Sequence, residues 1–221
     1  MSGKIILRET NEKRILTLEL SNKKKNNALS LKMLSQIIKI LSKTDYVNKF
    51  NCLLFTGSDN GSFSSGADLN DIKKLITNDK VDLYNEKLNK VMDLMNIINI
   101  PIISLLREYC FGAGFMLALN SDIIIASEET LFCIPATKLK IKLHNNQLLF
   151  LKKKLNNFFL NDLILSSRKV TAQEAYNFNI ISAYIKQNKF DEFSKDYIKK
   201  NCLIRQKYIA ILHKIYLKKK F

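Results

Sequence analysis

The sequence predicts an α/β fold, because segments with the apolar period of strands alternate along the chain with segments that have the apolar period of helices. Residues 14–20 alternate apolar and polar side chains, as a half-buried strand does, whereas residues 81–98 carry apolar side chains at helical spacing. With 221 residues and a hydrophobic content of 47%, the chain can bury one substantial core. One folded domain is therefore the simplest interpretation.

Capping residues and periodicity place the individual elements. Ser30 can cap the first helix, and Thr171 with Glu174 three residues later can form a capping box for a later one. Pro101 ends one helix and starts the strand that follows. The predicted strands are residues 4–9, 14–20, 53–55, 102–106 and 123–126, with residues 10–13 joining the first two as a hairpin. The predicted helices are residues 30–42, 81–98, 114–120, 145–155, 160–166 and 171–178, with a last one from residue 190 onward.

Two short segments combine glycine with small residues in a way that indicates a binding site. Residues 107–136 read as a strand end, a Gly-Ala-Gly turn, the start of an apolar helix, and a buried strand that Asp122 opens. A turn of this kind places backbone N–H groups at a helix N-terminus, where they can stabilise a developing negative charge. The sequence Ser-Phe-Ser-Ser-Gly-Ala-Asp-Leu precedes it at residues 62–69, and the order and spacing of the two segments make the pattern specific.

These two segments resemble the corresponding turns of the enoyl-CoA hydratase/isomerase (crotonase) family. Three further stretches fit that family in the same order, namely residues 27–30, 51–57 and 163–185. The resemblance covers roughly residues 4–187, and it implies a spiral of β-β-α units with a C-terminal helical region. We therefore expect a core domain at residues 1–187 and a helical segment at residues 188–221 that packs on the core or on a neighbouring subunit.

Members of this family bind acyl-CoA thioesters and stabilise the enolate oxygen with two backbone N–H groups, the oxyanion hole. By motif position, these donors correspond to Ala67 and Ala113. The glycines beside them, Gly66, Gly112 and Gly114, are implied to belong to the substrate pocket. Ala113 stands where the family usually has glycine, and it can serve as a donor if its φ is not required to be positive.

The resemblance also exposes a departure at the chemical centre. The two glutamates that activate water and protonate carbon in the hydratases correspond here to Met116 and Ala136, both implied to lie in the pocket. Neither side chain can transfer a proton, and the loss of one general acid or base typically lowers a rate by roughly 10²–10⁴. We therefore expect a poor or inactive hydratase, although the family itself implies a lyase or an isomerase.

One other residue is a candidate proton carrier. His144 lies eight residues after Ala136, and imidazole exchanges protons near neutral pH. The other interpretation of His144 is a solvated surface residue in a segment rich in Lys and Asn. With the oxyanion hole alone, or with His144, the chain could still isomerise, decarboxylate or cleave a thioester.

Coenzyme A enters as part of the substrate, and no covalently bound cofactor is implied. Family members place its 3′-phospho-ADP across the loop before the Asn-Ala-Leu motif and the turn at residues 65–68. The residues that this implicates are Lys24, Lys25, Ala28, Ser65, Ala67 and Leu69. Lysines suit a phosphorylated ligand, but the basic run at residues 23–25 fits an ordinary solvated loop equally well.

The formal net charge of +16 raises the question of a polyanionic partner such as nucleic acid, an anionic membrane surface or the phosphates of coenzyme A. A bias of composition is the preferred explanation, because Lys, Asn and Ile are abundant and the lysines are spread over the whole chain. An RNA-binding protein on the crotonase scaffold is kept as an alternative.

The remaining signals favour a soluble protein of the cytoplasm. No leader with a cleavage site opens the chain, and no apolar run is long enough to span a membrane. The cysteines lack Cys-x-x-Cys spacing and are read as reduced core thiols, so neither disulfides nor a metal site is expected; they are Cys52, Cys110, Cys133 and Cys202. The resemblance implies a role in fatty acid metabolism and assembly as a homo-trimer or hexamer.

The chain also departs from the family late in the sequence. Glycines expected from the resemblance are replaced by Lys140, Ser167 and Asn179. Such divergence keeps a further hypothesis open, in which the chain is a non-catalytic subunit or partner of an active paralogue. An acyl-CoA-binding protein is preferred over this partner role, and the partner role over RNA binding.

Overall fold

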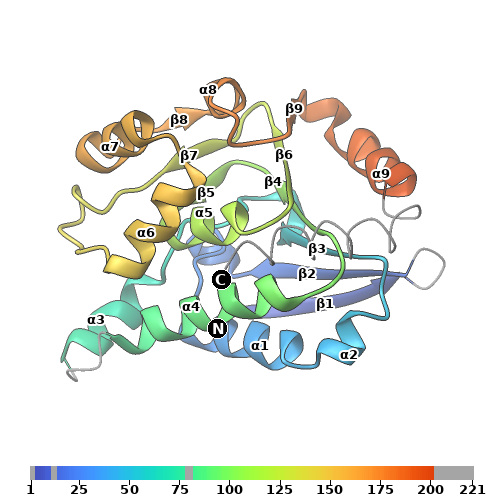
Figure 1. The fold of residues 1–221 in the computed structure, drawn as a ribbon, viewed down its shortest axis with the longest axis horizontal. Coiled ribbons are helices and arrows are strands. Elements are labelled where there is room, and N and C mark those ends of the chain that lie inside the picture. Colours follow the sequence, from blue (N-terminus) through green and yellow to red (C-terminus); the bar gives the residue numbers. More distant parts are fainter. Residues whose placement is uncertain (1–2, 11–13, 78–81, 202–221) are drawn as a thin grey trace.

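The computed structural model of the protein describes residues 3–10, 14–77 and 82–201, and it confirms the predicted mixed α/β fold (Figure 1). The strands are β1 (Lys4–Thr10), β2 (Ile15–Ser21), β3 (Cys52–Gly57), β4 (Ile102–Leu106), β5 (Tyr109–Phe111), β6 (Ile123–Ser127), β7 (Leu131–Cys133), β8 (Val170–Thr171) and β9 (Ala183–Ile185). The α-helices are α1 (Leu31–Leu41), α2 (Thr44–Val47), α3 (Leu69–Thr77), α4 (Asp82–Ile97), α5 (Gly112–Leu119), α6 (Asn145–Lys154), α7 (Asn157–Ser166), α8 (Ala172–Asn177) and α9 (Phe190–Asn201).

The strands form two sheets, and the chain alternates between them as it winds. The larger sheet has six strands in the order β1-β2-β3-β4-β6-β9, and the smaller has three in the order β5-β7-β8. In the larger sheet the hairpin pair β1–β2 is antiparallel and the other pairs are parallel. β4 and β6 belong to the larger sheet, while the strands that follow them, β5 and β7, belong to the smaller one. Helix α5 follows β5 directly, near the centre of the molecule in Figure 1.

The period-2 pattern of β2 buries side chains on both faces of the larger sheet. Three leucines at alternate positions belong to the main apolar core: Leu16, Leu18 and Leu20. Ile15 has the opposite orientation and belongs to a second apolar cluster, together with Ile198 of α9. Helix α9 therefore packs against the larger sheet through Ile198.

A buried arginine joins α9 to the rest of the fold. Arg107 is only 7% exposed, and its guanidinium donates to the Asp191 carboxylate at 2.6 Å. The same guanidinium lies 4.4 Å from the ring centroid of Phe190, as in a cation–π contact. Its backbone carbonyl accepts a hydrogen bond from the N–H of Phe63 at 3.0 Å. One residue thus holds α9 with its side chain and the segment around Phe63 with its backbone.

The predicted elements are confirmed, with small shifts at their ends. Helix α7 begins at Asn157 rather than at residue 160, because the Asn156 side chain accepts from two N–H groups of its first turn. The central helix α5 begins at Gly112 rather than at residue 114. The capping box of Thr171 and Glu174 is present at the start of α8. The hairpin connection at residues 11–13 and the predicted tail at residues 202–221 lie outside the described residues.

The predicted core thiols can be checked at three of the four positions. Cys52, Cys110 and Cys133 are buried, and burial raises the pKa of the Cys110 and Cys133 thiols above its ordinary value. Cys202 lies outside the described residues. In the ranges that the structure describes, no helix combines the length and the apolar character that crossing a bilayer requires.

Three positions where the resemblance implied glycine keep a left-handed backbone without it. The φ angles are 55° at Lys140, 49° at Ser167 and 57° at Asn179. A residue with a Cβ atom adopts this region at a cost of roughly 1–2 kcal/mol, and asparagine tolerates it best. The fold has therefore retained the backbone turns although the residues best suited to them have been replaced.

Replacing Lys140 by glycine is expected to raise the free energy of unfolding by about 0.5–1 kcal/mol, because relief of left-handed strain exceeds the entropy that glycine adds to the unfolded chain. Urea unfolding followed by circular dichroism measures the change. Asn179→Gly is the matched control and should give a smaller gain. Unchanged or lower stability of Lys140→Gly would show that this backbone carries no strain.

Candidate functional site

Residues 64–68 are held on both sides by main-chain hydrogen bonds. On one side, the N–H of Ser64 donates to Tyr109 O at 2.8 Å and the N–H of Phe111 donates to Ser64 O at 2.9 Å. On the other side, the N–H of Leu29 donates to Gly66 O at 2.7 Å and the N–H of Asp68 donates to Leu29 O at 2.9 Å. The turn predicted from the Ser-Gly-Ala-Asp motif is thus clamped between Leu29 and β5.

Glycine is required at two positions of this clamp. Gly66 has φ +102°, and a Cβ built on it would lie 3.0 Å from Phe111 O and 3.7 Å from Ala113 N. A Cβ on Gly114 would lie 2.6 Å from the Cβ of Ser64, which is closer than real side chains approach. The two motifs that stand about fifty residues apart in the sequence are therefore in direct contact, as their resemblance to family turns implied.

The backbone conformation at residue 113 is one that alanine adopts without strain, although the family usually has glycine there. Gly112 takes the positive φ of this turn, at +48°, whereas Ala113 lies inside helix α5 and is not among the described residues with positive φ. In the part of the chain that the structure describes, neither the N–H of Ala67 nor that of Ala113 donates a hydrogen bond. Both residues line the same cavity, so two amide donors are available beside it.

The cavity has a volume of about 410 Å³, and residues of helices α3, α4 and α5 and of the segment 134–144 line it. Helix α3 contributes apolar side chains at Leu69, Ile72 and Ile76, and α4 contributes Tyr84 and Leu88. The sequence-predicted residues that line it are Ser65, Gly66, Ala67, Leu69, Gly112, Ala113, Met116, Ala136 and His144. Gly114 packs against Ser64 instead, and Lys24, Lys25 and Ala28 belong to the neighbouring loop rather than to the lining.

The cavity is apolar at the two positions where the sequence predicted that acid and base groups are missing. Met116 is 2% exposed and Ala136 is 8% exposed, and both belong to the main core. Among the described residues that line the cavity there is no aspartate or glutamate. The side chains with a titratable group are Tyr84, Lys140, Lys142 and His144. The described lining of the site therefore offers backbone N–H groups, lysines and a histidine, and it contains no carboxylate.

Lys25 has a partner that the sequence did not reveal. Its Nζ lies 2.7 Å from both carboxylate oxygens of Asp68, at the end of the clamped turn. Burial raises the pKa of Asp68, but the hydrogen bonds from Lys25 and from the N–H of Asn70, together with the charge of Lys25, outweigh burial and hold that pKa below its ordinary value. Lys25 thus stabilises the turn, and its charge is partly neutralised by Asp68.

His144 lies at the rim of the cavity, at the start of helix α6. Its Nε2 lies 2.7 Å from Nδ2 of Asn85 and 3.6 Å from a carboxylate oxygen of Asp82, both on α4. Gln147 completes the contact, because it donates to Asn85 Oδ1 at 2.9 Å and accepts from the backbone N–H of His144 at 3.0 Å. Sequence reasoning missed Asn85 and Gln147. The spacing of His144 and Gln147, as in a capping box, was the available signal for one of them.

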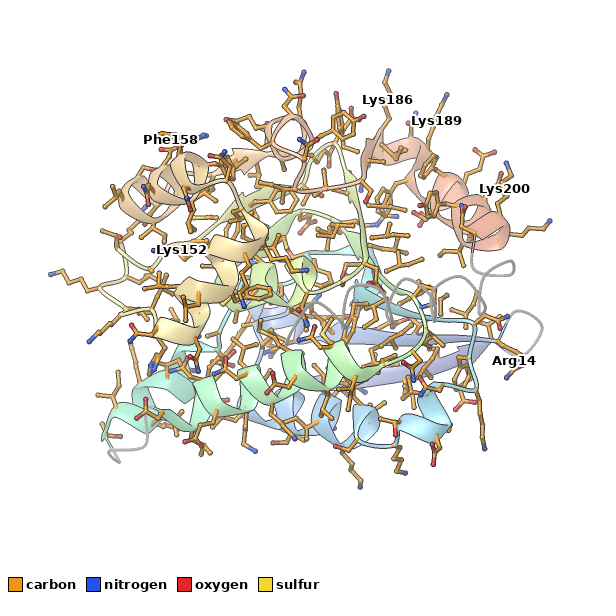
Figure 2. All side chains as sticks on the ribbon, viewed as in Figure 1. Arg14, Lys152, Phe158, Lys186, Lys189 and Lys200 are labelled. Atoms are coloured by element: carbon orange, nitrogen blue, oxygen red, sulfur yellow. The ribbon has the colours of Figure 1, made fainter. Side chains whose placement is uncertain are left out.

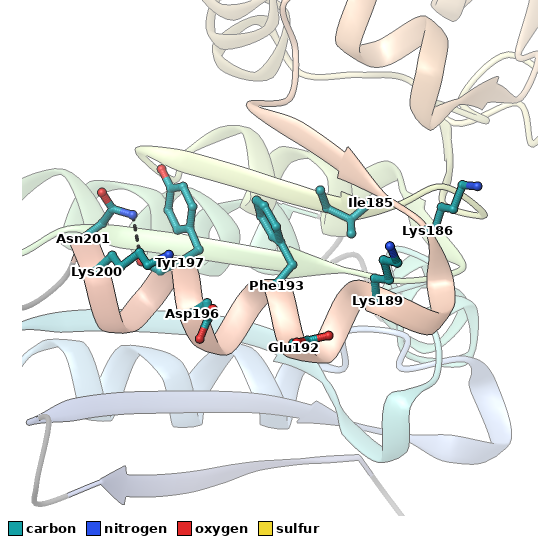
Figure 3. A pocket seen from close by; sticks show the side chains of 9 residues that line it. All are labelled: Ile185, Lys186, Lys189, Glu192, Phe193, Asp196, Tyr197, Lys200 and Asn201. Atoms are coloured by element: carbon teal, nitrogen blue, oxygen red, sulfur yellow. Dashed lines mark hydrogen bonds between the residues drawn. The ribbon is translucent and has the colours of Figure 1, made fainter.

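A second hollow, of about 500 Å³, lies beside β9 and α9 (Figure 3). Stacked rings of Phe193 and Tyr197 form part of it, with ring centroids 5.9 Å apart. Lysines and the acidic residues Glu192 and Asp196 line it together, so its charge is mixed. None of the residues predicted from the sequence lies there. Within the described ranges, no group of three or more His, Cys, Asp or Glu side chains is placed to hold a metal ion.

Comparisons with known proteins show the family and the fold of the chain. The sequence profile described as "Enoyl-CoA hydratase/isomerase" matches residues 10–219. The chain therefore belongs to the enoyl-CoA hydratase/isomerase family. Its likeness to solved structures shows the crotonase fold: an enoyl-CoA hydratase/carnithine racemase of Magnetospirillum magneticum has a TM-score of 0.86 at 20% identity, covering 98% of this chain and 82% of the other. Human enoyl Coenzyme A hydratase domain-containing protein 3 has a TM-score of 0.86 at 22% identity, covering 97% and 83%.

A curated relative matches only part of the chain. Carnitinyl-CoA dehydratase of Salmonella typhi is 30% identical over 116 residues, which is 52% of this chain and 44% of that relative. The matched segment thus spans less than half the length of the relative.

Replacing Gly114 by alanine is expected to lower the free energy of unfolding by about 1–3 kcal/mol, because the added methyl group overlaps Ser64 inside the clamp. Gly61→Ala is the matched control, since its Cβ would meet only Ser58 O at 3.6 Å, an ordinary contact. Thermal and urea unfolding of both variants measure the difference. Equal stability of the two variants would contradict the close approach of α5 to Ser64.

Replacing Lys25 by methionine is expected to destabilise the fold in a pH-dependent way. The folded-state pKa of Asp68 lies below its ordinary value of 3.8, so the stabilisation that the pair provides is complete above that value and is lost as the pH falls through the folded-state pKa. The difference in unfolding free energy between wild type and Lys25→Met should therefore be constant above about pH 5 and shrink below it.

Urea unfolding between pH 7 and pH 3 tests this dependence. Lys24→Met is the control, because Lys24 forms no ion pair within the described residues. It should show a small effect that does not vary with pH. A pH-independent effect of Lys25→Met would mean that the ion pair does not lower the pKa of Asp68.

Proposed function

We propose that this protein binds an acyl-CoA thioester in the 410 Å³ cavity and stabilises the thioester enolate with the amide N–H groups of Ala67 and Ala113, with little or no hydratase activity. The observation that carries the proposal is the presence of two amide donors without partners beside a cavity that has no carboxylate among its described lining residues. The first feature supports enolate stabilisation, and the second argues against water addition.

Backbone donors suit this role because they are fixed before the ligand arrives. The clamp holds Ala67 between Leu29 and β5, and Ala113 lies in the first turn of α5, where N–H groups lack helical partners. Loss of one such donor costs roughly 2.7–4 kcal/mol of transition-state stabilisation in enzymes where it has been measured. Two donors can therefore supply a large part of the barrier reduction for enolate formation.

Hydration needs acid and base groups that the described lining residues of this cavity do not provide. Addition of water to an enoyl thioester requires a base to activate the water and an acid to protonate carbon. Met116 and Ala136 stand at the positions that correspond to the two glutamates of the hydratases, and neither carries an ionisable group. The name of the relative from Salmonella typhi also describes a reaction that adds or removes water. Proton transfer of that kind is not expected from this chain.

We place the nucleotide of coenzyme A near Ser65, Ala67 and Leu69, which line the cavity, and near Ala28 in the neighbouring loop. In the basic run that precedes Ala28, Lys23 pairs with Asp59 and Lys25 pairs with Asp68. Lys24 is left without an ion pair in the described part of the chain, so it is the lysine of this run best suited to a phosphate.

We extend the proposal to assembly as a homo-trimer or hexamer in the cytoplasm. Helix α7 supports association because Phe158 is 87% exposed and Leu165 is 74% exposed, and their spacing of seven residues puts them on one face. Binding of nucleic acid has less support. In Figure 2 Lys186, Lys189 and Lys200 lie along α9 and the turn before it, whereas Lys152 lies on α6. Glu192 and Asp196 line the same hollow as the lysines of α9, so this part of the surface is of mixed charge.

Calorimetry with acetyl-CoA and crotonyl-CoA, combined with mass spectrometry of the same samples, tests the proposal. We expect dissociation constants in the micromolar range and no hydrated product. Ala136→Phe fills the cavity and should weaken binding about tenfold or more, whereas Leu149→Phe, on the exposed side of α6, should leave it unchanged. Binding that Ala136→Phe does not affect would place the ligand elsewhere, and absence of binding would favour the partner role.

A further inference from the structure

The described lining of the cavity includes two amide donors that can stabilise an enolate, and it includes few groups that can accept a proton. The hydroxyl of Tyr84 donates to Leu29 O at 2.9 Å and is buried. Burial, with the charges of Asp71 and Asp68, raises the pKa of Tyr84, so that it stays protonated and cannot serve as a base near neutral pH. Lys140 and Lys142 also line the cavity, and a lysine ammonium is a hydrogen-bond donor that attracts anions.

The imidazole of His144 is already engaged. Its Nε2 contacts Asn85, Asn85 contacts Gln147, and Gln147 contacts the backbone of His144, so the three residues close a ring. Gln147 is only 6% exposed, and Asn85 is next to Tyr84 on α4. The ring packs the start of α6 against α4 at the cavity rim. The ring gives His144 a packing role in which its Nε2 is already engaged by Asn85, with an Asp82 carboxylate oxygen 3.6 Å away.

The reactions that an oxyanion hole can support differ in what else they need. Isomerisation requires a base that removes a proton from carbon, and thioester cleavage requires a nucleophile or an activated water. Loss of carbon dioxide from a carboxylate on the α-carbon requires neither, because the breaking carbon–carbon bond itself supplies the electron pair of the enolate. Decarboxylation is thus the one of these three reactions that the described lining residues can support as they stand.

We propose that the substrate is an acyl-CoA whose acyl group carries a carboxylate on the α-carbon, and that the protein decarboxylates it; this inference rests on the function proposed above. The bond between the α-carbon and the carboxylate breaks, and its electron pair forms the carbon–carbon double bond of the enolate. Carbon dioxide leaves, and the thioester oxygen takes the negative charge opposite Ala67 and Ala113. A proton from water then adds to the α-carbon and gives a thioester one carbon shorter.

The lining of the cavity fits this substrate at both ends. Lys140 and Lys142 lie at the exposed side of the lining, where their charges attract an acyl group that carries an additional anion. Met116, Ala136 and Ile134 make the interior apolar. A carboxylate is poorly solvated among such side chains, whereas the amide donors stabilise the charge once it has moved to the thioester oxygen. Charge transfer toward the donors is therefore favoured.

Incubation of the full chain with malonyl-CoA and methylmalonyl-CoA tests the inference, with acetyl-CoA and propionyl-CoA measured by mass spectrometry. In D₂O, the product should carry one deuterium on the α-carbon. Ala136→Phe should abolish the conversion. Lys140→Met and Lys142→Met should each raise the KM for malonyl-CoA about 2–5-fold with little change in kcat, since exposed charges contribute modestly. Lys152→Met is the matched control, because Lys152 is exposed on α6 and does not line the cavity, and it should leave both constants unchanged.

The outcomes separate the inference from the function on which it rests. Conversion that Ala136→Phe abolishes supports both. Binding of crotonyl-CoA without conversion of either carboxylated thioester overturns the inference and leaves acyl-CoA binding intact. Incorporation of deuterium into the α-position of butyryl-CoA, if His144→Ala abolishes it, also overturns the inference, because it shows a working base. Failure to bind any of these thioesters overturns both.

Discussion

Main-chain hydrogen bonds that place residues 64–68 between Leu29 and β5 are the constraint on which the candidate site depends. They position Ser64 and Gly66 against the first turn of α5, and the missing side chains of Gly66 and Gly114 let the two segments touch. Tyr84 adds a further bond to Leu29 O, so α4 also supports the turn. If this arrangement were loosened, the backbone of Ala67 and Ala113 would no longer be held in place, whatever side chains line the cavity.

Backbone groups and side-chain groups of the candidate site respond differently to sequence change. Donors that belong to the backbone survive substitution as long as the turn keeps its shape, and the turns at Lys140, Ser167 and Asn179 show that this fold keeps its shape even without favourable glycines. Acids and bases belong to side chains and are lost with a single replacement, and neither Met116 nor Ala136 carries an ionisable group. Under the function proposed here, charge stabilisation by the backbone is therefore retained where side-chain proton transfer is not.

Local signals explain how much of the fold could be predicted. The caps at Ser30 and Thr171 and the alternation in β2 act over a few residues, and the structure confirms them. No local sequence pattern predicts the contact of Lys25 with Asp68, which are forty-three residues apart, or the contact of Asn85 with His144. The short strands β7, β8 and β9 also escaped prediction, because two or three residues carry no detectable period. The motif turns and the apolar floor could be predicted, whereas the polar network at the cavity rim depends on tertiary packing.

Arg107 makes the C-terminal helix and the site energetically dependent on each other. Its side chain holds Asp191 and Phe190 of α9, while its carbonyl accepts the N–H of Phe63, next to the clamped turn. Undocking of α9 therefore removes a restraint on the turn. By thermodynamic reciprocity, a ligand that stabilises the turn through this residue must strengthen the docking of α9 by the same free energy. The contact of Arg107 with α9, which is not part of the cavity lining, would then share in the free energy of ligand binding.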